Sequence, residues 1–255
     1  MRSLAEGAAA PPPTWRTYYA TNRGGGLFSE SLSQRLGALI AAPAGRLGAP
    51  PTALTLVNLA LGLAVSVTVV LLAGPVAAGT VPAWPVGLLA LLGWQVAYAF
   101  DCADGQLARV TGRTSPAGAR LDILCDVAAQ IALVTAVAAV AAAQRPGVPT
   151  WLVAAFAGTW MVNLVTSVLQ SGAQGASMVT SRSLPVRLVK LVRDYGAVIA
   201  LAGLVLTLVP AWTVAFVVAF TVVNGGFLLA SIAFGSVSSM APRSEGPRRS
   251  QGVDG

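Results

Sequence analysis

Residues 84–143 contain two long apolar runs joined by a short polar connection, and read WPVGLLALLGWQVAYAFDCADGQLARVTGRTSPAGARLDILCDVAAQIALVTAVAAVAAA. The apolar residues follow one another without the alternating polarity that is typical of membrane β-barrel strands. Each run has about the 20 residues that an α-helix needs to cross a bilayer. The segment therefore predicts two antiparallel transmembrane helices, Trp84 to Cys102 and Gly118 to Ala143, joined by a short loop.

The rest of the chain continues this pattern. Of its 255 residues, 55% are hydrophobic and 10% are charged, and the mean hydropathy is +0.73. Soluble globular domains carry about 25% charged residues, so the composition excludes an ordinary soluble enzyme as well as a disordered chain. We predict an all-α polytopic membrane protein with six transmembrane helices. The four further spans are Ala53–Leu72, Trp151–Leu169, Tyr195–Val209 and Trp212–Phe234.

The basic residues indicate how the spans are oriented. With six spans and a cytoplasmic N-terminus, fifteen of the sixteen Lys and Arg residues fall on the cytoplasmic side, and only Arg145 falls outside. Basic residues concentrate in cytoplasmic loops. We therefore expect a multi-pass protein of the cell membrane with both termini and the active site cytoplasmic. The net charge of +7 is explained by this topology, and we expect no nucleic-acid partner.

The chain ends are polar or rich in Ala, Pro and Gly, and the membrane domain is predicted between them. We expect residues 1–26 to be a flexible cytoplasmic N-terminus, 27–236 the membrane domain, and 237–255 a disordered cytoplasmic tail. Within the membrane domain, residues 27–46 predict an amphipathic juxtamembrane helix on the inner surface. Leu32, Leu36 and Leu39 or Ile40 would face lipid, and Ser33 and Arg35 would face water. The alternative is a loosely ordered linker.

Four of the nine acidic residues lie within 26 residues of one another. Asp101 and Asp104 are three apart on one predicted helix, and Asp122 and Asp126 are four apart on the next, so each pair projects from one helix face. Carboxylates brought together in a membrane repel one another unless protons or cations intervene. Hard oxygen ligands favour Mg²⁺, Mn²⁺ or Ca²⁺. Two such ions would clamp a phosphoryl group between a nucleophile and a leaving group.

The residues between the two acidic pairs fit a phosphate ligand. Gly105 has no side chain, so a ligand can approach the backbone closely. Ala108 and, on the facing helix, Gly118 keep the same wall low. Arg109 offers a planar fork to a phosphate or to a metal-bound carboxylate.

The aspartates and their neighbours resemble the signature of the CDP-alcohol phosphotransferase family. The matching residues are Asp101, Asp104, Gly105, Ala108, Arg109, Gly118, Asp122 and Asp126, and all eight agree in identity and spacing. The resemblance implies transfer of a substituted phosphate from a CDP-alcohol, most often CDP-diacylglycerol, to a second alcohol with release of CMP. It also implies a homodimer in the membrane.

The same resemblance implies roles for individual residues. Asp101, Asp104 and Asp122 would bind two divalent metal ions, Mg²⁺ or Mn²⁺. Asp126 would be the general base for the acceptor hydroxyl and would also touch metal. Gly105, Ala108, Arg109 and Gly118 would line the CDP pocket together with Asp101 and Asp104. The first span of the family usually opens with Pro-Asn, two residues and Thr. Here Pro51 and Thr55 agree and Thr52 replaces Asn, which makes Thr55 a further predicted nucleotide contact.

A basic cluster suggests the acceptor. Arg182, Arg187, Lys190 and Arg193 gather before the fifth predicted span, and Arg113 lies between the two motif helices. They would bind an anionic polyol phosphate, and inositol phosphate is favoured because the inositol-phosphate branch of the family uses basic residues in this region. Glycerol phosphate or another alcohol is the alternative. Ordinary cytoplasmic charge in contact with anionic lipid also explains these residues. Asp194 is expected to pair with a neighbouring cation.

Two other classes of membrane protein also contain intramembrane aspartates. An intramembrane prenyltransferase also uses aspartates and magnesium diphosphates, but it would release pyrophosphate and would need a second aspartate cluster on a distant span. An ion transporter also contains intramembrane acids, but the acids here lie at one cytoplasmic edge. The chain has no histidine, which excludes histidine-based catalysis.

Overall fold

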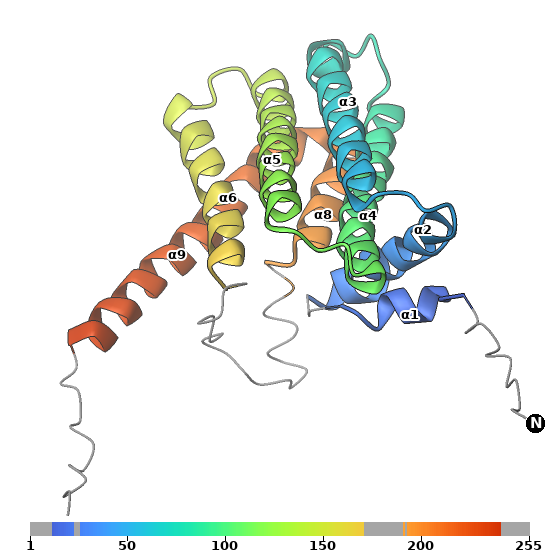
Figure 1. Cartoon of the computed structure of the whole chain (residues 1–255). Coiled ribbons are helices and arrows are strands. Elements are labelled where there is room, and N and C mark those ends of the chain that lie inside the picture. Colours follow the sequence, from blue (N-terminus) through green and yellow to red (C-terminus); the bar gives the residue numbers. More distant parts are fainter. Residues whose placement is uncertain (1–11, 23–25, 171–190, 192, 241–255) are drawn as a thin grey trace, which may run out of the picture.

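The computed structural model describes residues 12–22, 26–170, 191 and 193–240, and every regular element in those ranges is helical (Figure 1). This confirms the predicted all-α class. The α-helices are α1 (Trp15–Tyr19), α2 (Gln34–Arg46), α3 (Pro51–Ala77), α4 (Ala83–Thr111), α5 (Pro116–Gln144), α6 (Thr150–Gln170), α8 (Tyr195–Leu208) and α9 (Thr213–Met240). A π-helical turn, η1 (Ser29–Ser33), precedes α2, and a 3₁₀ turn, η2 (Pro210–Trp212), precedes α9.

Helices occur at all six predicted spans, but they differ in length. Within the described residues, four segments are long and apolar enough to cross a membrane: Pro51–Ala77, Ala83–Thr111, Pro116–Gln144 and Pro210–Ala233. Thr150–Val162 and Tyr195–Leu208 are shorter apolar helices. A bilayer needs about 20 apolar residues per helix, so the six-span arrangement stays a prediction for α6 and α8.

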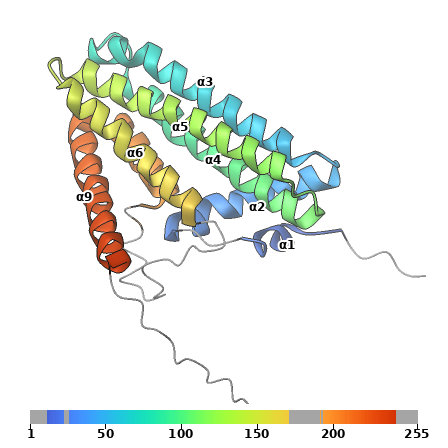
Figure 2. The same cartoon turned by 60° about the vertical axis from the view of Figure 1, so that its left-hand side comes forward.

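The bundle is organised around α3 and α4. Helix α3 packs against both α4 and α5, α4 also packs against α8, and α6 packs against α9 (Figures 1 and 2). Close approach of α8 to α4 depends on Gly203, where a Cβ atom would lie 2.5 Å from the Cα atom of Leu91. Helix α8 begins at Tyr195, directly after Asp194, whose side chain caps the helix by accepting a hydrogen bond from the Gly196 amide.

The N-terminal elements lie beside the end of α4 that carries the aspartates (Figure 1). Leu32, Leu36 and Leu39 are 40%, 36% and 53% exposed, as expected for a face turned to lipid. The prediction that Ser33 faces water is wrong, because Ser33 is fully buried. Ser33 shares one helix face with Gly37 and Ala41, and this face of small residues packs against other helices. Placement of α2 at the membrane surface stays a prediction.

Helices occur on both sides of the predicted domain boundaries, which stay predictions. Within the stretch expected to be flexible, residues 15–19 form α1, and the Tyr18 side chain is 2% exposed. Tyr18 belongs to a small second core between α1, α2, α3 and α4 that also contains Ala38 and Leu107. At the other end, α9 continues to Met240, past the predicted limit of the membrane domain at residue 236.

Candidate active site

The two helices that carry the aspartates are joined by a sharp turn. Helix α4 ends at Thr111, and Gly112 follows it with a φ of +68°, a conformation that favours glycine. Ser115 then caps α5, because its Oγ atom accepts a hydrogen bond of 3.0 Å from the Gly118 amide. Pro116 occupies the first helical position, where its missing N–H is not needed. These local signals place the start of α5 directly after the end of α4.

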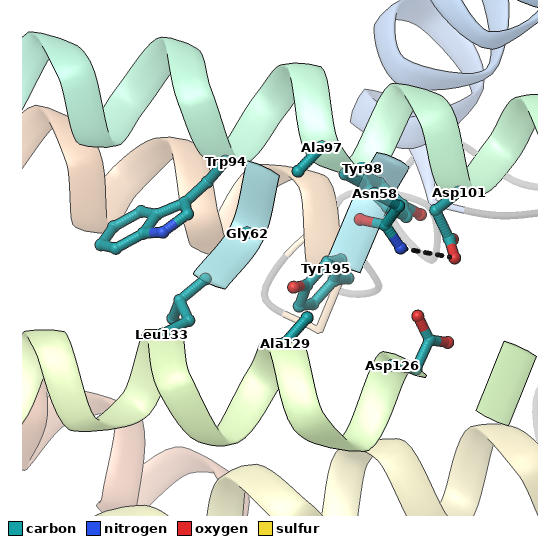
Figure 3. Close-up of a pocket in the computed structure, with 10 residues that line it drawn as sticks. All are labelled: Asn58, Gly62, Trp94, Ala97, Tyr98, Asp101, Asp126, Ala129, Leu133 and Tyr195. Atoms are coloured by element: carbon teal, nitrogen blue, oxygen red, sulfur yellow. Dashed lines mark hydrogen bonds between the residues drawn. The ribbon is translucent and has the colours of Figure 1, made fainter. Parts of the chain in front are cut away.

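Helices α4 and α5 are joined by a short loop, as predicted, but they make little direct contact along their length. Instead α3 packs against both of them. A small cavity beside the aspartates is lined by residues of α3, α4, α5 and α8, and Figure 3 shows that Asp101 on α4 and Asp126 on α5 point toward each other at its end. Direct packing of α4 on α5 would press like-charged carboxylates together, which is unfavourable without a ligand between them.

Three of the four motif aspartates converge. One carboxylate oxygen from each of Asp101, Asp122 and Asp126 lies within 4.8 Å of the others. The Oδ1 atom of Asp122 is buried and has no hydrogen-bond partner among the described residues. A buried carboxylate oxygen without a partner is costly, and a divalent cation bound by oxygen ligands would satisfy it. The donor set therefore fits a hard divalent metal ion.

The fourth aspartate lies outside this group. Asp104 is 5% exposed, and its Oδ2 atom accepts a hydrogen bond of 2.5 Å from the Thr55 hydroxyl on α3. Thr55 was predicted to contact the nucleotide, and here it orients a motif carboxylate. The metal role of Asp104 and the nucleotide role of Thr55 both stay predictions.

Sequence reasoning missed Asn58. Its Nδ2 atom donates a hydrogen bond of 3.4 Å to Oδ1 of Asp101 (Figure 3). Thr55 and Asn58 lie three residues apart on α3 and are both 4% exposed, so α3 presents a polar face to the aspartates. Two polar residues at helical spacing within an apolar run were the signal that could have identified this face.

The small residues and Arg109 also take up defined places. A Cβ atom at Gly105 would lie 3.0 Å from Nη1 of Arg109, so the glycine leaves room for the guanidinium one turn further along α4. The Ala108 carbonyl accepts hydrogen bonds from the amides of Gly112 and Arg113 and thereby ends α4. Gly118 lies in the first turn of α5. Contact of these residues with a nucleotide stays a prediction.

The cavity beside the aspartates has a polar end and an apolar end. The carboxylates of Asp101 and Asp126 and the side chain of Asn58 form the polar end, and Trp94 and Leu133 line the apolar end (Figure 3). The tyrosines Tyr98 and Tyr195 pack edge to face, with ring centroids 4.8 Å apart. The full lining is Asn58, Gly62, Trp94, Ala97, Tyr98, Asp101, Asp126, Ala129, Leu133 and Tyr195.

The predicted acceptor residues are only partly described. Arg182, Arg187 and Lys190 lie outside the described residues. Arg113 is exposed, and its Nη1 atom donates hydrogen bonds of 3.2 Å and 3.4 Å to the carbonyls of Gly48 and Ala49. Arg193 is half-buried, with its guanidinium carbon 4.9 Å from the ring centroid of Phe227. Neither arrangement tests a role in acceptor binding.

The expectation that Asp194 pairs with a cation is wrong. Its carboxylate accepts hydrogen bonds from the backbone amides of Phe28 (2.8 Å), Ser29 (3.0 Å) and Gly196 (3.1 Å), and from the Ser29 hydroxyl. The physical reason is its position at the start of α8, where unpaired amides are available. The amides of Phe28 and Ser29 come from a distant part of the chain, which the sequence pattern could not indicate.

The motif aspartates lie within a region of the chain that matches a known protein family. The family model described as CDP-alcohol phosphatidyltransferase matches residues 49–223, about two thirds of the chain. The matched range contains all four motif aspartates, Thr55 and Asn58, and it begins after α2. No curated protein matches the chain. The match favours a phosphotransferase over the prenyltransferase and transporter alternatives.

Proposed function

The chain belongs to the CDP-alcohol phosphatidyltransferase family, and we propose on this basis that it makes a phospholipid by transferring a phosphatidyl group from CDP-diacylglycerol to a polar alcohol. Members of the family use a CDP-alcohol donor and an alcohol acceptor in a membrane. The observation that carries the proposal is the convergence of Asp101, Asp122 and Asp126 within 4.8 Å, at the end of a cavity.

The motif aspartates have two proposed roles, which are charge neutralisation through bound metal ions and proton transfer. We assign Asp101, Asp104 and Asp122 to the binding of two divalent ions, Mg²⁺ or Mn²⁺, with Asp126 as a further ligand. When bound, such ions supply positive charge that stabilises the diphosphate and the departing CMP. Thr55 holds the Asp104 carboxylate and Asn58 holds that of Asp101, so both carboxylates are oriented before a ligand arrives.

Asp126 is the proposed general base. Its carboxylate faces the cavity (Figure 3), where an acceptor hydroxyl can reach it. Asp126 accepts the hydroxyl proton while the alcohol oxygen bonds to the phosphorus that carries the diacylglycerol. The bond from that phosphorus to the bridging oxygen breaks, and CMP leaves with that oxygen. On the donor side, Gly105, Ala108, Arg109 and Gly118 would contact the CDP group.

The acceptor that we favour is inositol phosphate, and glycerol 3-phosphate is the alternative. A phosphorylated polyol gives a role to the basic residues Arg113 and Arg193 and to Arg182, Arg187 and Lys190. The apolar helices and the distribution of basic residues support a protein of the cell membrane whose site opens to the cytoplasm. A homodimer is proposed from the family alone.

The test is CMP release by the purified protein in detergent with CDP-diacylglycerol and Mg²⁺ or Mn²⁺. The acceptor panel contains inositol phosphate, glycerol 3-phosphate, inositol, serine and no acceptor. Asp126→Asn is the inactive reference, and Arg145→Gln, which changes one charge just beyond the other end of α5, is the matched control. Acceptor-dependent CMP release that Asp126→Asn abolishes and Arg145→Gln retains is the expected result. Folded protein that releases no CMP with any acceptor would refute the proposal.

A further inference from the structure

Asp194 joins two segments that are far apart in the chain. Its Oδ2 atom accepts hydrogen bonds from the amides of Phe28 and Ser29, and its Oδ1 atom accepts from the Ser29 hydroxyl and the Gly196 amide. Asp194 is 4% exposed and Ser29 is 2% exposed. One buried carboxylate thus fastens the turn before α2 to the first turn of α8. We call this set of contacts the Asp194 clasp.

The clasp reaches the cavity through two side chains of α4. The Tyr98 hydroxyl donates a hydrogen bond of 3.1 Å to Ser29 Oγ, and Gln95 Nε2 donates one of 2.7 Å to the Gly196 carbonyl. Tyr98 lines the cavity together with Tyr195, the residue that follows Asp194. We call these two side chains the tyrosine wall. Through Tyr98, the tyrosine wall is hydrogen-bonded to the N-terminal segment.

The residues of the Asp194 clasp are tightly packed against neighbouring glycines. A Cβ atom at Gly26 would overlap the Asp194 carboxylate, and one at Gly196 would lie 2.9 Å from Ser29 Oγ. Two turns further along the same segment, a Cβ atom at Gly37 would lie 2.8 Å from Cβ of Cys102, the neighbour of Asp101. The N-terminal segment thus packs directly against the turn of α4 that carries the motif.

A second set of hydrogen bonds connects the N-terminal part of the chain to α4, next to the motif. Gln106 follows Gly105 and is fully buried, and its Nε2 atom donates hydrogen bonds of 2.8 Å to Asn22 Oδ1 and 2.9 Å to the Gln34 carbonyl. The family match begins only at residue 49, so these contacts come from a part of the chain outside the matched region.

We propose that Asp194 and Ser29 are positioning residues, which dock residues 26–46 onto α4 and α8 and hold the Tyr98–Tyr195 wall in the geometry that receives the acceptor. This inference rests on the proposed function. Tyr98 lies one helical turn before Asp101 on α4, and Tyr195 follows Arg193 by two residues, whereas Gly105 and Arg109 lie beyond Asp101 in the other direction along α4. Loosening the clasp therefore weakens binding of the acceptor and leaves binding of the donor unchanged.

Asp194→Asn tests the clasp with little change in volume. An amide has one oxygen and one NH₂ group, and the NH₂ group cannot accept a hydrogen bond. Whichever way the amide turns, at least one of the three backbone amides loses its acceptor. Ser29→Ala and Tyr98→Phe are milder variants, since each removes a single hydroxyl. Tyr19→Phe is the matched control, because Tyr19 donates its hydroxyl to the Glu30 carbonyl within the N-terminal segment and does not reach the cavity.

The first measurement is amide hydrogen exchange, which needs no substrate. In the intact protein, residues 26–46 should be protected. Asp194→Asn should speed exchange throughout residues 26–46, and Tyr98→Phe should do so to a smaller extent. Tyr19→Phe should leave protection of α2 unchanged. Faster exchange confined to the amides of Phe28, Ser29 and Gly196 would mean that Asp194 only caps local amides, and it would overturn the proposal.

The second measurement separates the two substrates, with CDP-diacylglycerol as donor and inositol phosphate as the acceptor probe. Asp194→Asn and Ser29→Ala should raise the acceptor KM on the order of tenfold, with the donor KM unchanged. A fall in kcat alone would match a loss of folded protein and would overturn the positioning role. If the wild type transfers to no acceptor, the proposed function fails. The exchange result then decides the clasp by itself, and unchanged protection of residues 26–46 overturns it.

Discussion

Replacement of Gly105 by alanine should weaken donor binding without destabilising the protein. A Cβ atom at residue 105 would lie 3.0 Å from Nη1 and 3.4 Å from Nη2 of Arg109. The contact with Nη1 is shorter than ordinary van der Waals contact, so the guanidinium has to move by a few tenths of an ångström. The end of an arginine side chain can move easily, and the backbone of α4 therefore keeps its path.

The expected magnitudes follow from these contacts. Alanine is favoured over glycine in a helix interior by roughly 0.5–1 kcal/mol, which offsets the crowding of Arg109, and the melting temperature should change little. Loss of one charge-assisted hydrogen bond from Arg109 to a donor phosphate should cost about 1.5–3 kcal/mol. This corresponds to a donor affinity that is roughly 10- to 150-fold weaker.

The assay is calorimetric binding of CDP-diacylglycerol in detergent with Mg²⁺, together with thermal melting. Gly158→Ala is the matched control, because Gly158 lies inside α6 and a Cβ atom there would have no heavy atom within 4 Å. That variant should melt at an equal or higher temperature than the wild type and should bind the donor with unchanged affinity.

A double-mutant cycle decides whether the effect acts through Arg109. Arg109→Ala alone should weaken donor binding to a similar extent. In the Arg109→Ala background, Gly105→Ala should add nothing, because the displaced group is already gone. Additive losses would show that the new methyl group meets the nucleotide directly, and unchanged affinity in Gly105→Ala alone would show that the guanidinium does not bind the donor. Either result refutes the reasoning.

Three further predictions concern the aspartates and the acceptor. Chelation should lower the melting temperature and Mg²⁺ or Mn²⁺ should restore it, because three carboxylates within 4.8 Å repel one another without a cation; a melting curve that ignores both treatments would contradict a metal site. Asp122→Asn should abolish CMP release while the protein melts, in the presence of a chelator, at least as high as the wild type, and retained transfer would remove Asp122 from the site. Arg193→Ala should raise the KM of inositol phosphate more than that of CDP-diacylglycerol, as measured by steady-state CMP release. The same fold change in both KM values would exclude Arg193 from acceptor binding.

The helices and the motif were predictable because their signals are local. Continuous apolar runs of about 20 residues specify helices whatever their neighbours are, and helices occur at each predicted place. Spacings of three and four residues place Asp101 with Asp104, and Asp122 with Asp126, on one helix face each. Gly112 and Ser115 specify the turn between the two helices through their own backbone preferences. The family resemblance rests on the same local residues, and the family match confirms it.

These local signals do not predict contacts between segments that are distant in the chain. Helix periodicity indicates which residues share a face, but it does not indicate which helix each face contacts. Ser33 was therefore assigned to water, although its face of small residues is buried. Asn58 was overlooked because its partner, Asp101, is on another helix. The lack of direct packing between α4 and α5 likewise depends on α3, which packs against both.

The sequence by itself determined the helical class, the sites of the helices and the motif by which the chain is assigned to its family, because these depend on residue type and on spacing along one helix. The tertiary structure alone decided that three of the four carboxylates converge while Asp104 bonds to Thr55. It also decided that Asp194 binds backbone amides more than 160 residues away rather than a neighbouring cation. A buried polar group takes the partners that the packing of helices brings within hydrogen-bond distance, and that packing is a property of the whole bundle.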